Sequence, residues 1–277
     1  MSHFRILLCL LSFFILKGSL IGSQFDYGYL WDYQPILING EEVSKGTYNG
    51  TGLSAVMYER YERGIKPLLK ELEGPIKVLD LGANNGFFSL MISRDFDALC
   101  LMVDTTDRLA DICEANDQNG QLLYLKKKLS PSDLLKMAKK EHFDLILALH
   151  FLHNVEDWRE WVEPLSQLGD HLILETPCFD DPRVGNPKNC NAIASHYLSL
   201  PNSLQLEGFP RGYEGAYDFF MWIKYPPFQG EKKVGISLST FLELNGAFPR
   251  RSFIEPLRKL ERRGEVILDS NHTYRLQ

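Results

Sequence analysis

Short apolar runs alternate with longer amphipathic segments between residues 76 and 175. The apolar runs have the length and composition of buried strands, and the segments between them repeat apolar side chains at helical spacing. Strands that alternate with helices form a parallel sheet that is covered on both faces. The fold class is therefore α/β, with a doubly wound and mostly parallel sheet. The predicted strands are 76–81, 98–103, 121–126, 143–149 and 171–175, and the predicted helices are 87–96, 107–119, 131–141 and 155–168.

The segments on either side of this region are interpreted as small additions to it. Residues 24–75 form a covering segment that ends in a helix beginning at Ser54. A helix over 191–200 is followed by runs at 204–207 and 216–225, which are predicted to pair as antiparallel strands and give the sheet an antiparallel C-terminal strand. The main domain accordingly spans 76–230. Residues 231–277 form an appended lobe, because about forty residues seldom sustain a core of their own.

The first 23 residues have the pattern of a secretory signal peptide or a membrane anchor. Arg5 precedes the apolar run 6–16, and small residues follow Lys17. This run is shorter than the roughly 20 apolar residues of a membrane span. An N-terminal core helix is the alternative. We expect any membrane association to involve residues 6–22.

The charge of the chain bears on its partners. The formal net charge is -6 at pH 7, which argues against a broad surface for nucleic acid. The run from Lys126 to Lys128 could still form a local basic patch. A small-molecule or protein substrate is therefore favoured over nucleic acid.

The first predicted strand leads directly into the loop Gly82-Ala83-Asn84-Asn85-Gly86, and a helix follows. Glycine at both ends of the loop lets the backbone bend sharply and approach a ligand without a clash from a Cβ atom. The G-x-G-x-x-G order of dinucleotide sites is missing. Asp80 places an anion at the mouth of the loop, which suits a cationic ligand and repels a pyrophosphate. The alternative is a chance strand, turn and helix with a core aspartate.

Residues 78–89 strongly resemble the first motif of the class I S-adenosylmethionine-dependent methyltransferases, a Rossmann-like family, including the Asp-x-Gly-Ala-Asn-x-Gly order found in many members. The resemblance extends over residues 53–176. It implies that S-adenosyl-L-methionine is the cofactor. By position, it assigns cofactor binding to Asp80, Gly82, Ala83, Asn84, Gly86, Asp104, Leu129 and Leu149.

Three of these assignments lie outside the loop. Asp104 ends the second strand, where the resemblance implies that its carboxylate accepts hydrogen bonds from both ribose hydroxyls. A helix N-cap is the alternative role for Asp104. Leu129 follows the third strand, where the family often packs the adenine, and Leu149 ends the fourth strand.

His150 and His153 follow the fourth strand, where class I enzymes present side chains to the methyl group and the acceptor. An imidazole titrates near neutral pH, so either histidine could act as a general base. The alternatives are a buried strand-end role for His150 and capping of a helix at Val155 by His153 or Asn154. A metal site is disfavoured, because a third ligand at a suitable spacing is missing.

Glu175 ends the fifth strand and is the third candidate catalytic residue; it would face the acceptor or pair with a basic group. The sequence therefore predicts methyl transfer to an oxygen or nitrogen of a small-molecule or lipid-linked acceptor. A non-catalytic, S-adenosylmethionine-binding scaffold of the same fold is the alternative. A nicotinamide-dependent oxidoreductase is disfavoured by the missing glycine order. Because the cofactor is made in the cytosol, an exported chain conflicts with this function, and the localisation stays open.

Overall fold

The computed structural model describes residues 34–48, 51–52, 54–117, 120–179, 187–205, 209–210, 216–230, 236, 266–268 and 274–276. An eight-stranded sheet lies at its centre, in the order β10-β12-β9-β8-β5-β6-β7, with β11 paired to β12. Five neighbouring strands run parallel: β5 (Ile76–Leu81), β6 (Ala98–Asp104), β7 (Leu122–Lys126), β8 (Phe143–Leu149) and β9 (Gly169–Phe179). The antiparallel pairings involve β10 (Ser203–Gln205), β11 (Phe209–Pro210) and β12 (Ala216–Lys224).

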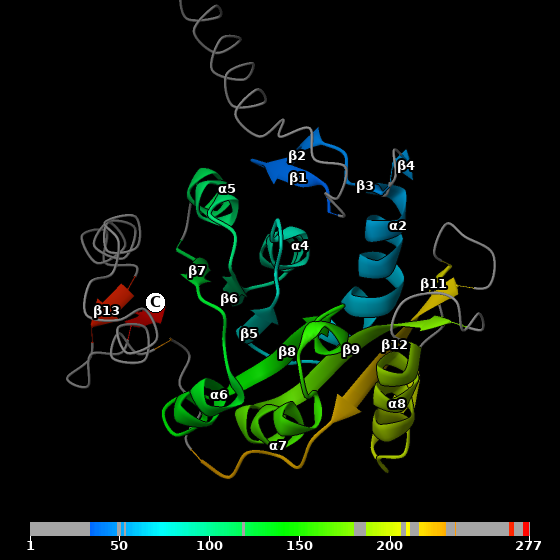
Figure 1. Ribbon diagram of the computed structural model, residues 1–277. Coiled ribbons are helices and arrows are strands. Elements are labelled where there is room, and N and C mark those ends of the chain that lie inside the picture. The colour runs from blue at the N-terminus through cyan, green and yellow to red at the C-terminus, as the bar shows by residue number, and fades with distance from the viewer. Residues whose placement is uncertain are drawn as a thin grey trace, which may run out of the picture.

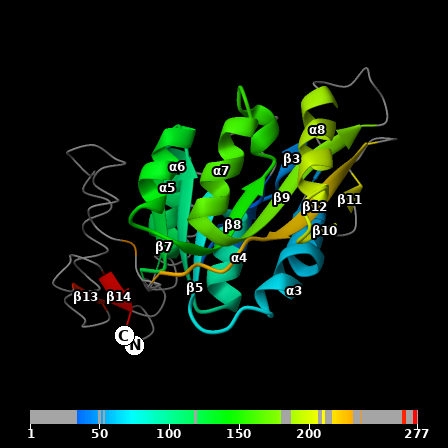
Figure 2. The same cartoon turned by 90° about the horizontal axis from the view of Figure 1, so that it is seen from below.

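Helices cover both faces of this sheet (Figures 1 and 2). Alternate residues of each strand point to opposite faces, so that Val78 packs in one buried cluster and Leu79 in the other. The first cluster includes side chains from α2 (Ser54–Glu59), the π-helix η1 (Arg60–Ile65), α3 (Lys66–Leu69), α4 (Phe87–Asp95) and α5 (Arg108–Asn116). The second includes side chains from α6 (Pro131–Ala138), α7 (Arg159–Leu168) and α8 (Pro187–Leu198).

The order of the strands reverses between β5 and β8. The chain passes from β5 outward through β6 to β7, and then returns to place β8 on the other side of β5. Ligands of open α/β sheets bind at the carboxyl ends of the strands beside such a switch point. The loops after β5 and β8 are therefore the two that border the expected site.

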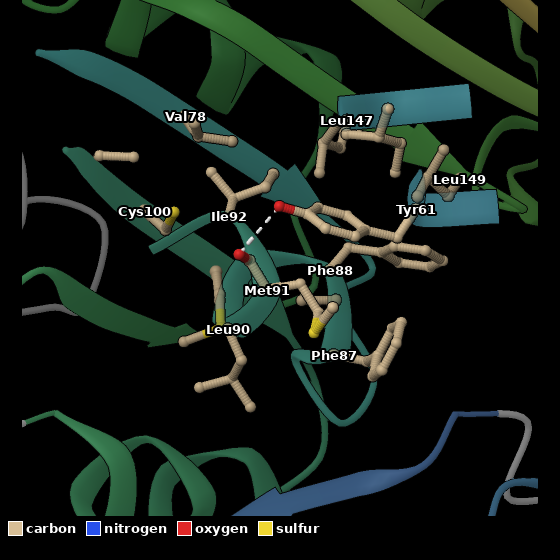
Figure 3. Close-up of a cluster of buried hydrophobic side chains, with 14 of the residues drawn as sticks. Tyr61, Val78, Phe87, Phe88, Leu90, Met91, Ile92, Cys100, Leu147 and Leu149 are labelled. Carbon is tan, nitrogen blue, oxygen red and sulfur yellow. Dashed lines mark hydrogen bonds between the residues drawn. The ribbon is translucent and has the colours of Figure 1, made fainter. Parts of the chain in front are cut away.

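Tyr61 fixes the π-helix to the helix that follows the glycine loop. Its ring is fully buried, and its hydroxyl donates to the carbonyl oxygen of Met91 at 3.0 Å and to Asp95 Oδ2 at 3.1 Å. Figure 3 shows the bond to Met91 in the cluster that includes Phe87 and Phe88. Burial and the neighbouring Asp95 carboxylate raise the pKa of Tyr61, so the hydroxyl keeps its proton as a donor. η1 and α4 are thereby held together on one face of the sheet.

A short hairpin covers the same face. β1 (Ile36–Ile38) and β2 (Glu41–Ser44) pair antiparallel, and the side chains of β1 are buried. Figure 1 shows this hairpin beside α4 and α5, and β1 contacts both helices. Two further pairs are β3 (Thr47–Tyr48) with β4 (Thr51–Gly52), and β13 (Val266–Leu268) with β14 (Tyr274–Leu276).

The predicted α/β fold, its mostly parallel sheet and its antiparallel C-terminal strand are confirmed. Several boundaries differ. β9 is longer than the predicted 171–175, because β12 pairs with it from His171 to Phe179. α8 begins at Pro187 and not at residue 191. The domain boundaries proposed at residues 23, 75 and 230 stay predictions.

The segment after β8 also differs from the prediction. A 3-10 turn, η2 (Leu152–Asn154), comes first, and α7 begins at Arg159 instead of Val155. Asp157 Oδ1 accepts from the Arg159 N–H at 3.0 Å. Capping of a helix at Val155 by His153 or Asn154 is therefore wrong. Asn154 instead donates its side-chain amide to the carbonyl oxygen of His150 at 2.7 Å.

The predictions for residues 1–23, including membrane association through 6–22, lie outside the described residues, as does most of the appended lobe predicted for 231–277. Within the described parts of the chain, the helices are all too short or too polar to cross a membrane.

Candidate functional site

The glycine loop after β5 has the backbone that its sequence predicts. Gly82, Asn84 and Gly86 have φ values of 72°, 55° and 72°, in the left-handed region that favours glycine and tolerates asparagine. A Cβ on Gly86 would lie 2.8 Å from Met102 Sδ, and one on Gly82 would lie 3.1 Å from Phe151 Cδ2. Both glycines are therefore favoured by their positive φ, and a Cβ at either position would also need a neighbouring side chain to shift. The closeness of the Phe151 side chain to Gly82 also places the β8 loop beside the β5 loop.

Asp80 lies beneath this loop, near the end of β5. Its side chain is 3% exposed, and its Oδ2 accepts a hydrogen bond of 2.8 Å from Ser89 Oγ of α4. Burial raises the pKa of Asp80 to about 7, the hydrogen bond from Ser89 opposes this rise, and the negative charge of Asp104 adds to it. A carboxylate in this position is poorly compensated by the protein itself, and a bound cation would stabilise its ionised form.

Asp104 joins the β5 loop to the β6 loop. Its Oδ2 accepts from the N–H of Asn84 at 2.8 Å, and its Oδ1 accepts from the N–H groups of Thr105 and Thr106 at 2.6 and 3.0 Å. An ionised carboxylate has about four acceptor positions. Three are used by the backbone, so the structure leaves room for one further donor. The helix that follows begins at Arg108 after Asp107, and Asp104 is not its N-cap.

The structure adds Gln34, which sequence reasoning missed. Its carbonyl oxygen accepts from Asn85 Nδ2 at 2.8 Å, and its side-chain Oε1 accepts from the N–H of Phe87 at 3.2 Å. Asn85 is completely buried. Residues far apart in the sequence therefore meet at the loop, and no local pattern around Gln34 indicates this contact.

His150 follows β8 in a sharp turn. Its φ of 53° is in the left-handed region, and its N–H donates to the carbonyl oxygen of Glu175 at 3.0 Å. The rings of His150 and His153 meet edge to face, with centroids 5.3 Å apart. The turn thus presents both predicted histidines at the carboxyl end of β8.

Glu175 belongs to β9, and its side chain lies next to that of His150. Its carboxylate is 1% exposed, and Oε1 is 3.0 Å from Arg60 Nε and 3.5 Å from His150 Nε2. Arg60 comes from η1 and is also buried. The sequence predicted Glu175 and His150 but missed Arg60. Of the two roles considered for Glu175, pairing with a basic group is the one that the structure displays.

Leu129 and Leu149 are both 8% exposed but belong to different clusters, Leu129 with α6 and α7 and Leu149 with α4 and η1. Their contact with a cofactor stays a prediction. Among the described residues, no group of three or more histidine, cysteine or acidic side chains is placed to hold a metal ion.

A family model described as a methyltransferase domain matches residues 54–208, which is more than half of the chain. The chain belongs to the methyltransferase domain family. The predicted resemblance to class I S-adenosylmethionine-dependent methyltransferases is thereby confirmed, and with it the cofactor expected for the family. The match begins at the first residue of α2, so Arg60 lies inside the family domain.

Several solved structures are similar to this chain. The N-terminal domain of EvdMO1, crystallised with SAH, has a TM-score of 0.52 and 12% identity, over 74% of this chain and 94% of that one, and it shows the same fold. The 1,6-didemethyltoxoflavin-N1-methyltransferase of Burkholderia thailandensis has a TM-score of 0.45 and 14% identity, over 62% and 81%. WbdD has a TM-score of 0.45 and 17% identity. The match covers 61% of this chain and 40% of the WbdD chain. No curated protein sequence matches.

The residues of the β5 loop fit the cationic cofactor of the family. Asn84 Oδ1 is buried and has no hydrogen-bond partner among the described residues, so it is an acceptor that an ammonium group would satisfy. Asp80 and Asp104 supply negative charge close by. A loop of this composition suits a sulfonium nucleoside better than a pyrophosphate.

Proposed function

We propose that the chain transfers a methyl group from S-adenosyl-L-methionine to an oxygen or nitrogen of a small-molecule or lipid-linked acceptor. The observation that supports this most directly is the contact between the glycine loop after β5 and the turn that carries His150 after β8. The two loops border the switch in strand order, where ligands of this fold bind.

The loops at the carboxyl ends of β5 and β6 form the donor side of the proposed site. S-adenosylmethionine supplies a methyl group that is already activated by the sulfonium. Asp104 would accept from a ribose hydroxyl, while its bonds to Asn84 and Thr105 keep the two loops in register. Asp80 would stabilise the positive charge of the methionine end.

The β8 and β9 ends form the acceptor side. His150 would take the proton from the acceptor, and the Glu175 carboxylate at 3.5 Å would stabilise the protonated ring. The buried Arg60 guanidinium balances the charge of Glu175 and holds its side chain in place. Much of the rate would come from alignment of donor and acceptor, because the sulfonium is a strong electrophile.

Cofactor binding tests the donor side. We expect the wild-type chain to bind SAH in calorimetry and an Asp104→Asn substitution to weaken binding by about tenfold, because an amide nitrogen would face backbone N–H donors that now bond to a carboxylate. Asp97→Asn is the matched control. Asp97 lies just before β6, at the amino ends of the parallel strands and away from the proposed site, and its carboxylate accepts from Gln121 Nε2. Equal affinity in all three chains would place the site elsewhere.

Turnover tests the acceptor side. With a labelled methyl donor and an acceptor found by screening, we expect His150→Gln to slow transfer by roughly tenfold to a hundredfold at saturating donor, and to leave the affinity for SAH unchanged. His171→Gln is the control, because His171 lies near the amino end of β9, on the far side of Glu175 from the end of the strand. An unchanged rate would remove His150 from the chemistry. Binding without transfer to any acceptor would favour the scaffold alternative.

A further inference from the structure

Gln34 contacts the glycine loop at two points. Its main-chain carbonyl holds the side-chain amide of Asn85 at 2.8 Å, and its side-chain oxygen accepts from the N–H of Phe87 at 3.2 Å. Asn85 and Phe87 lie on either side of Gly86 and are completely buried. One residue from outside the predicted motif therefore bonds to the last part of the loop and to the first residue of α4.

The start of α4 depends on this outside partner. The first N–H groups of a helix have no partner within the helix, and a side chain at the N-cap position usually accepts from one of them. Gly86 is the N-cap of α4 and has no side chain to do so, and its positive φ favours glycine at this position. The side-chain oxygen of Gln34 accepts from the N–H of Phe87, the first residue of α4, and so satisfies one of these N–H groups from outside the helix.

Gln34 is itself held in place by the hairpin that follows it. The β1 side chains are buried against α4 and α5. Asn116 of α5 donates to the carbonyl oxygen of Leu37 at 2.8 Å and accepts from the N–H of Asn39 at 2.8 Å. Because β1 is fixed by both packing and hydrogen bonds, the position of Gln34 relative to the loop is defined.

We propose that Gln34 is a positioning residue for the cofactor, which holds the Gly82–Gly86 loop in its binding conformation by capping α4 from outside the motif. The inference rests on the proposed function. Without the side-chain oxygen, the N–H of Phe87 loses its partner, and the loop samples conformations that the cofactor must reorder when it binds. The affinity falls in proportion to the population that is lost.

Two substitutions separate the hydrogen bond from the volume of the side chain. Gln34→Met keeps the length and packing but removes the acceptor, whereas Gln34→Glu keeps an acceptor. Both leave the main-chain bond to Asn85 intact. Gln121→Ala is the control. The Gln121 side chain also makes a hydrogen bond, to Asp97, but it does so at the amino ends of the parallel strands, away from the glycine loop.

We expect Gln34→Met to weaken SAH binding in calorimetry about three- to tenfold, Gln34→Glu to stay within about twofold of wild type, and Gln121→Ala to have no effect. Hydrogen exchange of the Phe87 amide in the cofactor-free chain should be faster only in Gln34→Met. Unchanged SAH affinity in Gln34→Met, or a lower unfolding midpoint without a change in affinity, would overturn the proposal.

The same measurements distinguish this inference from the proposed function. If the wild-type chain does not bind SAH, the proposed function fails. The exchange rate of the Phe87 amide still tests whether Gln34 holds the loop, and an equal rate in wild type and Gln34→Met would then overturn the inference as well.

Discussion

Replacing Asp80 with asparagine is expected to stabilise the cofactor-free chain at pH 8 and to weaken its binding of S-adenosylmethionine. Burial raises the pKa of Asp80 from 3.8 to about 7. Between these values the folded chain binds a proton that the unfolded chain has lost, so the contribution of Asp80 to stability falls as the pH rises. Above pH 7 the ionised carboxylate costs up to about 4 kcal/mol. The asparagine side chain of the variant is not charged, and its oxygen still accepts from Ser89.

Urea unfolding at two pH values measures this effect. At pH 8 we expect Asp80→Asn to increase the free energy of unfolding by between about 1 and 4 kcal/mol, and near pH 4 the difference should largely vanish. Ser89→Ala is the informative companion, because it removes the bond that favours the ionised form and should act in the opposite direction. A substitution that destabilises the chain equally at both pH values would contradict the argument.

The same substitution separates stability from binding. Since a cation next to Asp80 offsets the cost of its ionisation, we expect Asp80→Asn to weaken S-adenosylmethionine by about tenfold or more, and SAH, which lacks the sulfonium charge, by less. Calorimetry with both ligands at pH 8 measures the ratio. An unchanged ratio would show that Asp80 does not interact with the sulfonium.

Replacing Arg60 with methionine is expected to lower the free energy of unfolding by about 3 to 5 kcal/mol, because it leaves the Glu175 carboxylate buried without its main cationic partner. The side chains of the pair are 6% and 1% exposed. Arg63→Met is the matched control from the same helix, since the pair of Arg63 with Glu59 is exposed and should contribute less than about 1 kcal/mol.

Urea unfolding of the single and double variants tests the pairing. The double variant with Arg60→Met and Glu175→Gln should recover part of the lost stability, because no buried charge is then left unpaired. Losses that simply add would show that the two side chains act independently. If Arg60→Met costs no more than Arg63→Met, the pair does not contribute to the folded state.

The conformation of the β5 loop, on the donor side of the proposed site, could be predicted because its information is local. A strand, a carboxylate, two glycines and a helix follow one another between residues 76 and 95, and the left-handed φ values at Gly82 and Gly86 require the residue type that the sequence supplies. The buried parallel strands were predictable for the same reason, since each is a short apolar run.

The partners of the predicted residues could not be found in this way. Arg60 meets Glu175, and Gln34 meets Phe87, only because distant segments pack on the same face of the sheet. Apolar spacing also predicted a regular helix after Ser54, whereas residues 60–65 form a π-helix. The π-helical stretch is six residues long and lies between two short α-helical segments, so it is too short to change the helical spacing of apolar residues over the whole region.

On the acceptor side of the proposed site, the backbone differs from the prediction. Capping residues near Val155 indicated a helix there, yet the chain first makes the turn at His150 and the 3-10 turn η2. Asn154 bonds backward to His150 rather than forward into a helix. Side chains of this kind satisfy turns as readily as helix ends, and only tertiary packing decides between the two.

β5 and β8 are neighbours in the sheet, although β6 and β7 separate them along the chain. The two loops that border the proposed site therefore come from segments that are far apart in the sequence. Under the proposed function, substitutions at the carboxyl ends of β8 and β9 would change the acceptor that is methylated, while the β5 loop would keep its geometry toward the donor. In a lineage of such chains, a new acceptor could be acquired by change on one side alone, with the methyl source inherited intact.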